Sequence, residues 1–276
     1  MKTWSIQGNF YNFIIVDDHT HYKWTLFLLH KSNAFEAFKK FHALITTYYK
    51  GMLRATRSDC GGEFLLKDFI QYMEKHGVHH QLTAPHTPQQ NGIAERANPT
   101  IAEAAWAMMQ SAGMSQAFWE FAVTTAVHVR NHAPSHVTGN ISPHEWLIKQ
   151  PPDLSYLHIF GCLAYAHTTT QRSKFDPTSQ RLFIGYDNST KGYKLWNPSS
   201  HKIVITTDVM FEEYIFPLHT LKPLNTQLSS VPEHLPLLPP KLVDLALPES
   251  DNEDDDAPQP LLAPPKPPPT DPVLPS

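Results

Sequence analysis

The order of predicted strands and helices between residues 11 and 131 is the feature that most restricts the fold of this chain. Two apolar segments, Tyr11–Asp17 and Tyr22–Leu29, flank a polar turn and predict a β-hairpin. After it, helical and extended patterns alternate: a helix following Ser32, a strand over Leu53–Ser58, a helix over Leu66–His76, a strand over His79–Thr83, a helix from Ile93 and a helix over Phe118–Asn131. This order predicts an α/β fold in which helices cover a sheet.

A different pattern begins after Pro143, where short strands at even spacing replace the alternation. These strands are predicted over Phe160–Ala166, Arg181–Tyr186, Gly192–Pro198 and Lys202–Val209. Turn-forming residues separate them. Such a rhythm is typical of a small β-barrel.

Residues 218–276 differ in composition from the rest of the chain. They hold 15 of the 25 prolines, no aromatic residue and the acidic run Asp251–Asp256. Such a segment buries too little apolar surface to offset the entropy lost on ordering, so it predicts a disordered linker, with a docking peptide as the alternative. The segment carries a net charge of −6 and the remainder +2. Charge alone therefore does not predict nucleic-acid binding, which usually requires a clearly basic surface.

Several protein classes are disfavoured by what the sequence contains. The two cysteines, Cys60 and Cys162, match neither a disulfide framework nor a zinc knuckle. No apolar segment approaches the roughly 18 residues of a membrane span, and no signal peptide opens the chain. We therefore expect a soluble intracellular protein without membrane contact.

Two carboxylates stand in distinctive contexts. Asp59 lies in the segment Arg57–Phe64, directly after a predicted strand, and Glu95 follows the proline- and glycine-containing loop Pro85–Gly92 at the start of a predicted helix. Thirty-five residues separate them. Rigid elements beside a loop are suitable platforms for metal-binding carboxylates, and divalent magnesium prefers such oxygen ligands.

In these contexts, the chain resembles the integrase core of copia-type retrotransposons, which carries an Asp, Asp-35-Glu metal site on an RNase H-like fold. The resemblance implies three regions: a truncated RNase H-like catalytic core over residues 1–150, an SH3-like β-barrel over 157–215, and the disordered proline-rich acidic linker over 218–276. It also implies that the family's first strand, which is central in the sheet and bears the first catalytic Asp, would precede residue 1.

The resemblance assigns metal binding and catalysis to Asp59 and Glu95, with Mg²⁺ or Mn²⁺ held weakly or not at all without the first Asp. The implied reaction is DNA integration, in which the 3′ ends of element cDNA are processed and transferred into host DNA. We predict that the isolated chain performs no strand transfer. The alternative is a non-catalytic nucleic-acid-binding or interaction module from a decayed or host-adopted element.

Nucleic-acid contact is expected from the Pro85–Gly92 loop and the helix that follows, through Gln89, Asn91 and Arg96. Pro99 in that helix is tolerated in the first turn and costly deeper inside. The implied partners are the DNA of the element's cDNA ends and of the host target. RNA and a second copy of the chain remain open as further partners. The implied location is the nucleus, after a cytoplasmic particle stage.

Other residues receive structural interpretations. Asp17 and Asp18 are expected to serve a turn, since aspartate side chains accept bonds from nearby backbone amides. The histidines, among them His79, His80 and His86, show no zinc-site spacing. Trp106, Trp119 and Phe121 are predicted to be core residues, and Cys60 a structural thiol.

Two expectations concern the sheet of the first region. The Leu53–Ser58 strand should lack a partner on one side. Either residues 1–8 fold back as a substitute strand, or the expressed chain is poorly soluble, because an unpaired apolar strand edge promotes aggregation.

Overall fold

A computed structural model describes residues 3–49, 51–59, 62–64, 66–83, 92–166, 180–187 and 189–219. They belong to one compact unit, Met1–Leu224; the second unit, Asn225–Ser276, lies outside the described residues. The predictions for the acidic linker, Cys60, His86, Gln89 and Asn91 also fall largely or wholly outside them.

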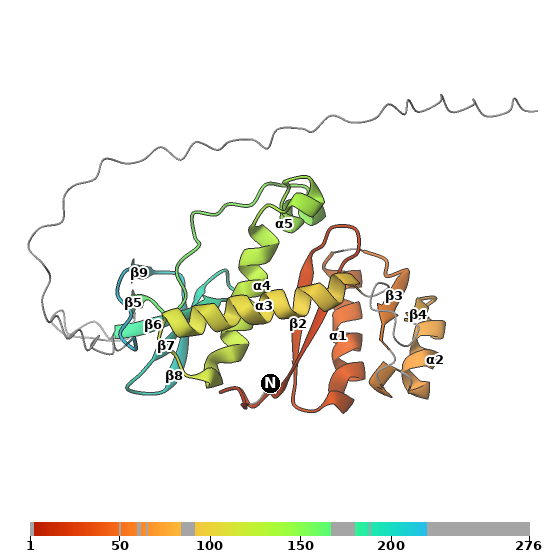
Figure 1. Ribbon diagram of the computed structural model, residues 1–276, viewed down its shortest axis with the longest axis horizontal. Coiled ribbons are helices and arrows are strands. Elements are labelled where there is room, and N and C mark those ends of the chain that lie inside the picture. Colours follow the sequence, from red (N-terminus) through yellow and green to blue (C-terminus); the bar gives the residue numbers. More distant parts are fainter. Residues whose placement is uncertain are drawn as a thin grey trace, which may run out of the picture. The chain divides into compact units, whose positions relative to one another are not determined.

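Strands and helices alternate in the first region, as predicted (Figure 1). The elements are β1 (Tyr11–Val16), β2 (Lys23–Leu28), α1 (Ala34–Thr47), β3 (Ala55–Ser58), α2 (Lys67–Lys75), β4 (His79–Leu82), α3 (Gly92–Ser111), α4 (Trp119–His132) and α5 (Pro143–Ile148). The short helix α5 was not predicted. Its N-terminus carries two local signals: Ser142 accepts a bond from the backbone N–H of Glu145, and Pro143 occupies the first turn.

The sheet of this region is divided into two separate pairs. Strands β1 and β2 form an antiparallel hairpin, with Tyr11 opposite Leu28 and Val16 opposite Lys23. Strands β3 and β4 are parallel and are connected by α2. Within the described part of the chain, no strand pairing joins β1 to β3. The prediction that the Leu53–Ser58 strand lacks a partner on one side is therefore confirmed for the described residues.

Helices lie on both faces of the strands. On one face, α1 and α2 contribute an aromatic cluster that includes Phe38, Phe41 and Phe69, and Ile15 packs against it. On the other face, α3 and α4 enclose Ile14, with Ile101 and Phe121 in the same cluster. The alternation of Ile14 and Ile15 between the two clusters follows the two-residue period of a strand. This mixed helix and strand architecture agrees with the predicted α/β class.

The third sheet has five antiparallel strands in the order β8-β7-β6-β5-β9. They are β5 (Leu163–Ala166), β6 (Gln180–Tyr186), β7 (Tyr193–Asn197), β8 (Lys202–Thr206) and β9 (Val209–Glu212). Four of them match predicted strands, whereas β9 was not predicted, because the last predicted strand ended at Val209. Cys162 beside β5 is fully buried, and burial raises the pKa of its thiol to about 12, so the thiol stays protonated.

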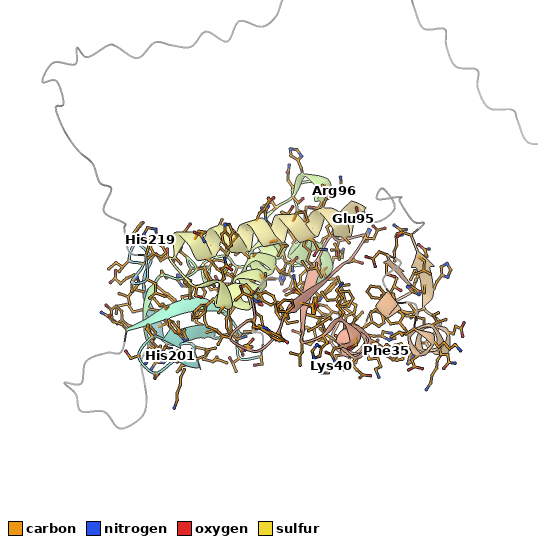
Figure 2. The ribbon with its side chains drawn as sticks, turned by 60° about the horizontal axis from the view of Figure 1, so that its bottom comes forward. Phe35, Lys40, Glu95, Arg96, His201 and His219 are labelled. Atoms are coloured by element: carbon orange, nitrogen blue, oxygen red, sulfur yellow. The ribbon has the colours of Figure 1, made fainter. Side chains whose placement is uncertain are left out.

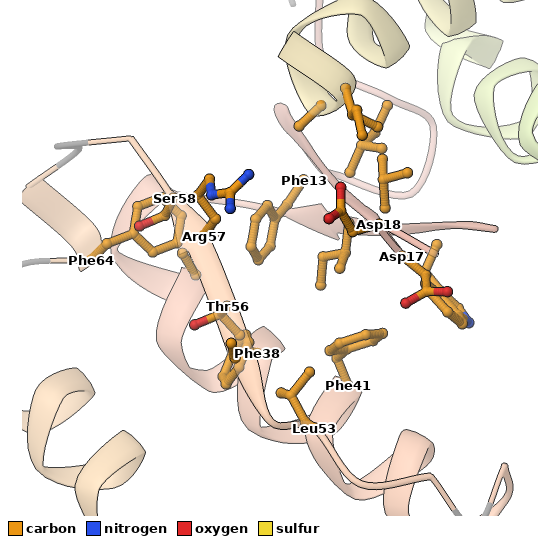
Figure 3. Close-up of a pocket in the computed structure, with 18 of the residues that line it drawn as sticks. Phe13, Asp17, Asp18, Phe38, Phe41, Leu53, Thr56, Arg57, Ser58 and Phe64 are labelled. Atoms are coloured by element: carbon orange, nitrogen blue, oxygen red, sulfur yellow. The ribbon is translucent and has the colours of Figure 1, made fainter. Parts of the chain in front are cut away.

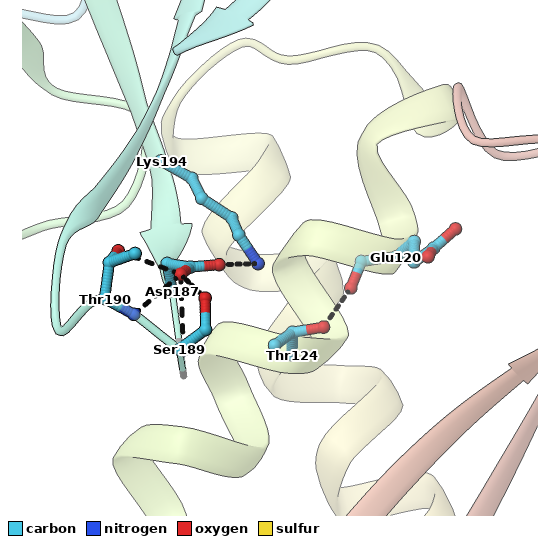
Figure 4. A network of polar contacts seen from close by, with 6 residues as sticks. All are labelled: Glu120, Thr124, Asp187, Ser189, Thr190 and Lys194. Atoms are coloured by element: carbon cyan, nitrogen blue, oxygen red, sulfur yellow. Dashed lines mark hydrogen bonds and ion pairs between the residues drawn. The ribbon is translucent and has the colours of Figure 1, made fainter. Parts of the chain in front are cut away.

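The turn between β6 and β7 is held by one carboxylate (Figure 4). Asp187 accepts bonds from the backbone N–H groups of Ser189 and Thr190, at 3.2 and 3.0 Å, and from both of their hydroxyls. Lys194 Nζ lies 3.4 Å from Oδ1 of Asp187. The hydroxyl bonds, followed by the backbone bond and the Lys194 charge, hold the pKa of Asp187 well below its usual range. Local polar contacts thus stabilise the turn of this hairpin.

Helix α4 packs against the β1–β2 hairpin and against the five-stranded sheet. Its residues Phe121, Ala122 and Val123 are buried, and Phe118 directly before it contacts Trp196 of β7 with ring centroids 4.8 Å apart. Gly185 of β6 lies so close to α4 that an added Cβ would meet the Thr125 hydroxyl oxygen at 2.9 Å. The small residue is required for this contact.

The structure corrects one expectation about an individual residue and decides between alternatives for two others. Trp119 and Phe121 are core residues as predicted, but Trp106 is 47% exposed, because it lies on the side of α3 turned away from the core. Pro99 is not in the first turn but inside α3, where it has no N–H to donate to the Glu95 carbonyl.

The other open alternative concerns the N-terminal segment. Residues 3–8 form a turn and not a substitute strand. The N–H of Ile6 donates to the Ala117 carbonyl at 3.0 Å, and the buried carboxylate of Glu120 accepts bonds from Ser5 and Asn9 at 2.7 and 3.1 Å. These bonds hold the segment against the start of α4, and residues 3–8 pair with neither β1 nor β3. Among the described helices, none combines the length and apolar character needed to span a membrane.

Candidate metal and nucleic-acid site

A cavity of about 710 Å³ lies between the two strand pairs. Its walls come from β1, from β3 and from α1, and the first turn of α3 also lines it. Figure 3 shows aromatic and aliphatic side chains from these elements around it, including Phe13, Phe38, Phe41 and Leu53. The cavity therefore occupies the place where the sheet is divided.

Asp59 lies at the rim of this cavity, directly after β3. Pairing with β4 fixes the end of β3, since the N–H of Thr83 donates to the Ser58 carbonyl at 3.0 Å. The Asp59 side chain is exposed. The placement at a strand end is the one predicted for this carboxylate.

Glu95 lies in the first turn of α3, as predicted, and is exposed (Figure 2). Its neighbours Gly92, Ile93, Ala94 and Arg96 line the cavity, whereas Glu95 is absent from the described lining. The structure thus brings Asp59 and the first turn of α3 to one cavity. For the expected metal site, we predict that the two carboxyl groups lie within about 10 Å of each other, because bridging ions sit roughly 3.5–4 Å apart.

Arg96 is the described member of the predicted DNA-contact set. Its Nε donates to the Gly92 carbonyl at 2.9 Å, so the side chain folds back on the start of its own helix. The side chain is exposed at the cavity rim. The guanidinium is therefore accessible to solvent.

Of the acidic pair after β1, Asp17 has the turn role expected of it. One carboxylate oxygen of Asp17 accepts bonds from the backbone N–H and the hydroxyl of Thr20, at 2.8 and 2.6 Å. Asp17 therefore closes the turn between β1 and β2. Asp18 is exposed, and both residues also line the cavity.

A cluster of histidines on α4 was missed by the sequence analysis. His128 stacks on Tyr186 of β6 with ring centroids 4.4 Å apart, and His132 stacks on His144 of α5 at the same separation. Burial, followed by the charges of His132 and His144, lowers the pKa of His128 to about 3. The spacing of His128 and His132, one helical turn apart, was the available signal.

The described residues do not fit a two-metal centre. Such a centre needs several carboxylates around two ions roughly 3.5–4 Å apart. No group of three or more histidine, cysteine, aspartate or glutamate residues with metal-binding geometry occurs in the described ranges.

Comparison with known proteins places the five-stranded sheet in a defined class. The sequence model of the family described as "Retroviral polymerase SH3-like domain" matches residues 162–224. This range begins just before β5 and extends beyond β9. The chain therefore contains a retroviral polymerase SH3-like domain.

The relatives extend this assignment to most of the chain. It is 38% identical over 215 residues, 77% of its length, to the retrovirus-related Pol polyprotein from transposon TNT 1-94 of Nicotiana tabacum. It is 32% identical over 219 residues to the Pol polyprotein from transposon RE2 of Arabidopsis thaliana, and 26% identical over 200 residues to the Ty1-LR3 Gag-Pol polyprotein of Saccharomyces cerevisiae. Over most of its length, the chain is a homologue of Pol polyproteins from Ty1/copia-type transposons.

The chain corresponds to a small part of each of these polyproteins. It spans 16% of the tobacco protein, 15% of the Arabidopsis protein and 11% of the yeast protein. The matched lengths of 200 to 219 residues fall well short of the 276 residues of the chain. The similarity therefore concerns one region of the polyproteins.

Proposed function

We propose that this chain is the integrase-related region of a retrotransposon Pol polyprotein, with an RNase H-like core, and that its ancestral activity is DNA integration. The observation that carries the proposal is the lining of the cavity, to which Asp59 at the end of β3 and the first turn of α3, which bears Glu95, both contribute. The homology to Pol polyproteins supports it. In this proposal, Asp59 and Glu95 are the remaining metal ligands, for Mg²⁺ or Mn²⁺.

The isolated chain is proposed to lack strand-transfer activity. Two exposed carboxylates hold a pair of hard cations far less well than three converging ones. The test is a joining assay with an oligonucleotide that carries the element's terminal sequence, in Mg²⁺ and in Mn²⁺. No joined product is expected. Product that disappears in Glu95→Gln would show that the chain is an active enzyme.

The second candidate function is non-catalytic binding of nucleic acid, and Arg96 favours it. Its guanidinium lies exposed at the rim, beside the loop expected to contact DNA. Titration of labelled duplex DNA, followed by fluorescence anisotropy at several salt concentrations, tests this role. Arg96→Ala should weaken binding and lower the salt dependence by about one phosphate contact.

A charge-matched control separates the Arg96 side chain from general electrostatics. Lys202→Ala removes one positive charge from the exposed first residue of β8 and should leave DNA affinity nearly unchanged. Equal losses in both variants would mean that binding is diffuse and that the rim is not the contact site. RNA in the same titration tests the other nucleic acid proposed as a partner. Nuclear localisation belongs to the same proposal and is tested by imaging the tagged chain.

A further inference from the structure

Three histidines and one tyrosine form a connected polar cluster where α4 meets α5 and the segment that follows α5. His128 and His132 lie on α4, His144 lies on α5, and Tyr156 lies in the connecting segment 149–158. The ring centroids of His128 and His132 are 4.3 Å apart, and those of His132 and His144 are 4.4 Å apart. We propose that this cluster is an acid-sensitive switch: its neutral form holds α5 and the connecting segment on α4, and its protonated form releases them.

The hydrogen bonds of the cluster require neutral imidazole rings. Nδ1 of His132 lies 2.7 Å from the His128 carbonyl oxygen, so this nitrogen carries a hydrogen and donates it. In the neutral ring Nε2 is then an acceptor, and it lies 3.3 Å from the Tyr156 hydroxyl oxygen. The same hydroxyl lies 2.8 Å from Nε2 of His128. Tyr156 thus donates to His132 and accepts from His128, and one hydroxyl joins the connecting segment to two residues of α4.

Protonation disrupts this arrangement. Both ring nitrogens of an imidazolium are donors, so Nε2 of a protonated His132 no longer accepts from the Tyr156 hydroxyl. With His128 protonated as well, the hydroxyl has a donor on each side, and its own hydrogen has no acceptor in the cluster. The imidazolium form of His144 places a hydrogen on Nδ1, which is buried and has no hydrogen-bond partner among the described residues.

The electrostatic surroundings of the cluster also favour neutral rings. Burial, followed by the charges of His132 and His144, lowers the pKa of His128 to about 3. Burial, followed by the His132 charge, lowers the pKa of His144. None of these influences is a carboxylate. Protons on the cluster therefore repel one another without a compensating negative charge.

The phenols around the cluster stay neutral in mild acid. Tyr186 of β6 stacks on His128, and Tyr22 of the β1–β2 turn contacts His144 with ring centroids 6.5 Å apart. Burial raises the pKa of both phenols and that of Tyr156. They therefore do not titrate between pH 7 and pH 4.5.

The other titratable groups on the adjoining elements are charged residues and one further histidine. Lys23 of β2 and Arg130 of α4 are cations, Glu145 follows His144 on α5, and His19 contacts Trp146 of α5 with ring centroids 5.0 Å apart. Asp153 lies in the connecting segment. Bonds from Ser155 lower the pKa of Asp153, so its carboxylate stays ionised at pH 4.5. Glu145 and His19 are the groups from which the cluster must be distinguished.

The elements that the cluster holds have little stability of their own. Helix α5 has six residues, and isolated helices shorter than about 12–15 residues are marginal in water. Residues 149–158 contain neither helix nor strand. On the SH3-like side, the His158 N–H donates to the Tyr186 hydroxyl at 3.0 Å, and the Tyr193 hydroxyl donates to the Tyr156 carbonyl at 3.4 Å. These bonds involve no imidazole, so acid releases the contacts with α4 and leaves these in place.

The inference does not depend on the proposed integrase origin, and its test is hydrogen exchange of the full chain at pH 7 and pH 4.5. Each rate is divided by that of an unstructured peptide at the same pH, which gives a protection factor. The N–H groups of Trp146 and Lys149, which donate to the Ser142 and Glu145 carbonyls, report on α5. The N–H of Phe183, which donates to the Cys162 carbonyl, reports on the SH3-like sheet.

The shift in pKa sets the size of the expected effect. If His128 regains its ordinary pKa of 6.5 on release, its proton favours the open form about a hundredfold at pH 4.5. Protection of Trp146 and Lys149 should therefore fall at least tenfold from pH 7 to pH 4.5, and both amides should then exchange at least tenfold faster than Phe183. Unchanged protection of α5 would overturn the proposal. So would equal protection of all three amides at pH 4.5, because the whole chain would then unfold at once.

A matched pair of variants tests the bridging hydroxyl at pH 7. Tyr156→Phe removes the bonds to both α4 histidines, whereas Tyr193→Phe removes a hydroxyl that bonds the backbone of the same segment. The Leu157 N–H, which donates to the Leu154 carbonyl, reports on the segment. Its protection should fall about tenfold in Tyr156→Phe and stay nearly unchanged in Tyr193→Phe. Equal protection in the two variants would refute the role of the hydroxyl.

Three further variants assign the acid response to the cluster. His128→Gln should reduce the pH-dependent loss of Lys149 protection at least tenfold, because the strongly shifted group is gone. Glu145→Gln and His19→Gln should leave that loss unchanged. A loss that persists in His128→Gln and disappears in either of the other two variants would assign the response to that other group and overturn the proposal.

Discussion

The two sheet-forming regions of this chain differ in how many of their strands have a partner on both sides. In the SH3-like region, β6, β7 and β5 each have two strand partners, and Phe183, Ile184 and Leu195 are completely buried. In the α/β region, four strands form two separate pairs around a cavity, and both strands of the β3–β4 pair have exposed residues. The comparison teaches that a similar number of strands can give a closed core or an incomplete one. The difference lies in whether the inner strands have partners on both sides.

Matched truncations in the two regions should give the largest difference. Phe183→Ala removes a fully buried ring from β6 and should lower the free energy of unfolding by about 3–5 kcal/mol. Phe13→Ala removes a half-buried ring that lines the cavity of β1, and should cost only about 1–2 kcal/mol. Urea denaturation measures both values. Equal losses would mean that the α/β region is as well packed as the SH3-like region.

A stabilising change is expected in α3, which covers the divided sheet. Pro99 lies inside this helix, and its side chain is exposed. Pro99→Ala restores the missing backbone donor and should raise the free energy of unfolding by up to about 3 kcal/mol. The thermal midpoint provides the measurement. Asn98→Ala, at the neighbouring exposed position, controls for helix propensity and should add only about 0.5 kcal/mol.

The contact between α4 and β6 tests how tightly the SH3-like region is packed. Gly185 has a φ of +137°, and its missing Cβ leaves room for Thr125. Gly185→Ala should therefore destabilise by about 2 kcal/mol, from overpacking and backbone strain together. Gly139→Ala is the control, because that glycine also has a positive φ but has open space around it. If both variants lose the same amount, backbone strain alone accounts for the effect.

Mild acid should weaken the histidine cluster on α4. The folded pKa of His128, about 3, lies below its ordinary value of 6.5, so folding favours the neutral ring. This contribution is complete above pH 6.5 and declines as the pH falls toward 3, by about 1.4 kcal/mol for each pH unit at most. The free energy of unfolding, measured by denaturation at several pH values between 7 and 4, reports this loss. His128→Gln should flatten the pH dependence; an unchanged slope would assign it to other groups.

The local patterns of this sequence predicted its elements well. The apolar runs of β1 and β2, the helical spacing of α1 and α2, and the short strands of the SH3-like region all formed close to their predicted bounds. The turn role of Asp17 also followed from local chemistry, because its partner Thr20 is three residues away. Local sequence patterns predict such features because the interacting residues are only a few positions apart in the sequence.

Long-range features were less accessible. The exposure of Trp106 depends on how α3 is rotated against α4, and the bonds of Glu120 to Ser5 and Asn9 join segments more than a hundred residues apart. For the candidate site, the sequence predicted Asp59 at the end of a strand and Glu95 in the first turn of a helix. The structure has both residues at these positions. Their roles as ligands are set by side-chain geometry that no periodicity encodes, so they remain predictions.

Helix α4 is a structural element that both regions share. Its buried residues contact Phe27 and Ile14 on one side, and Leu182 and Ile184 of β6 on the other, within one cluster. A helix buried on nearly all sides cannot be stable when either neighbour is removed. Limited proteolysis between residues 149 and 157 should therefore not release two folded fragments. The nicked chain should stay associated and melt in a single transition, so the two regions, although distinct in pattern, form one cooperative unit.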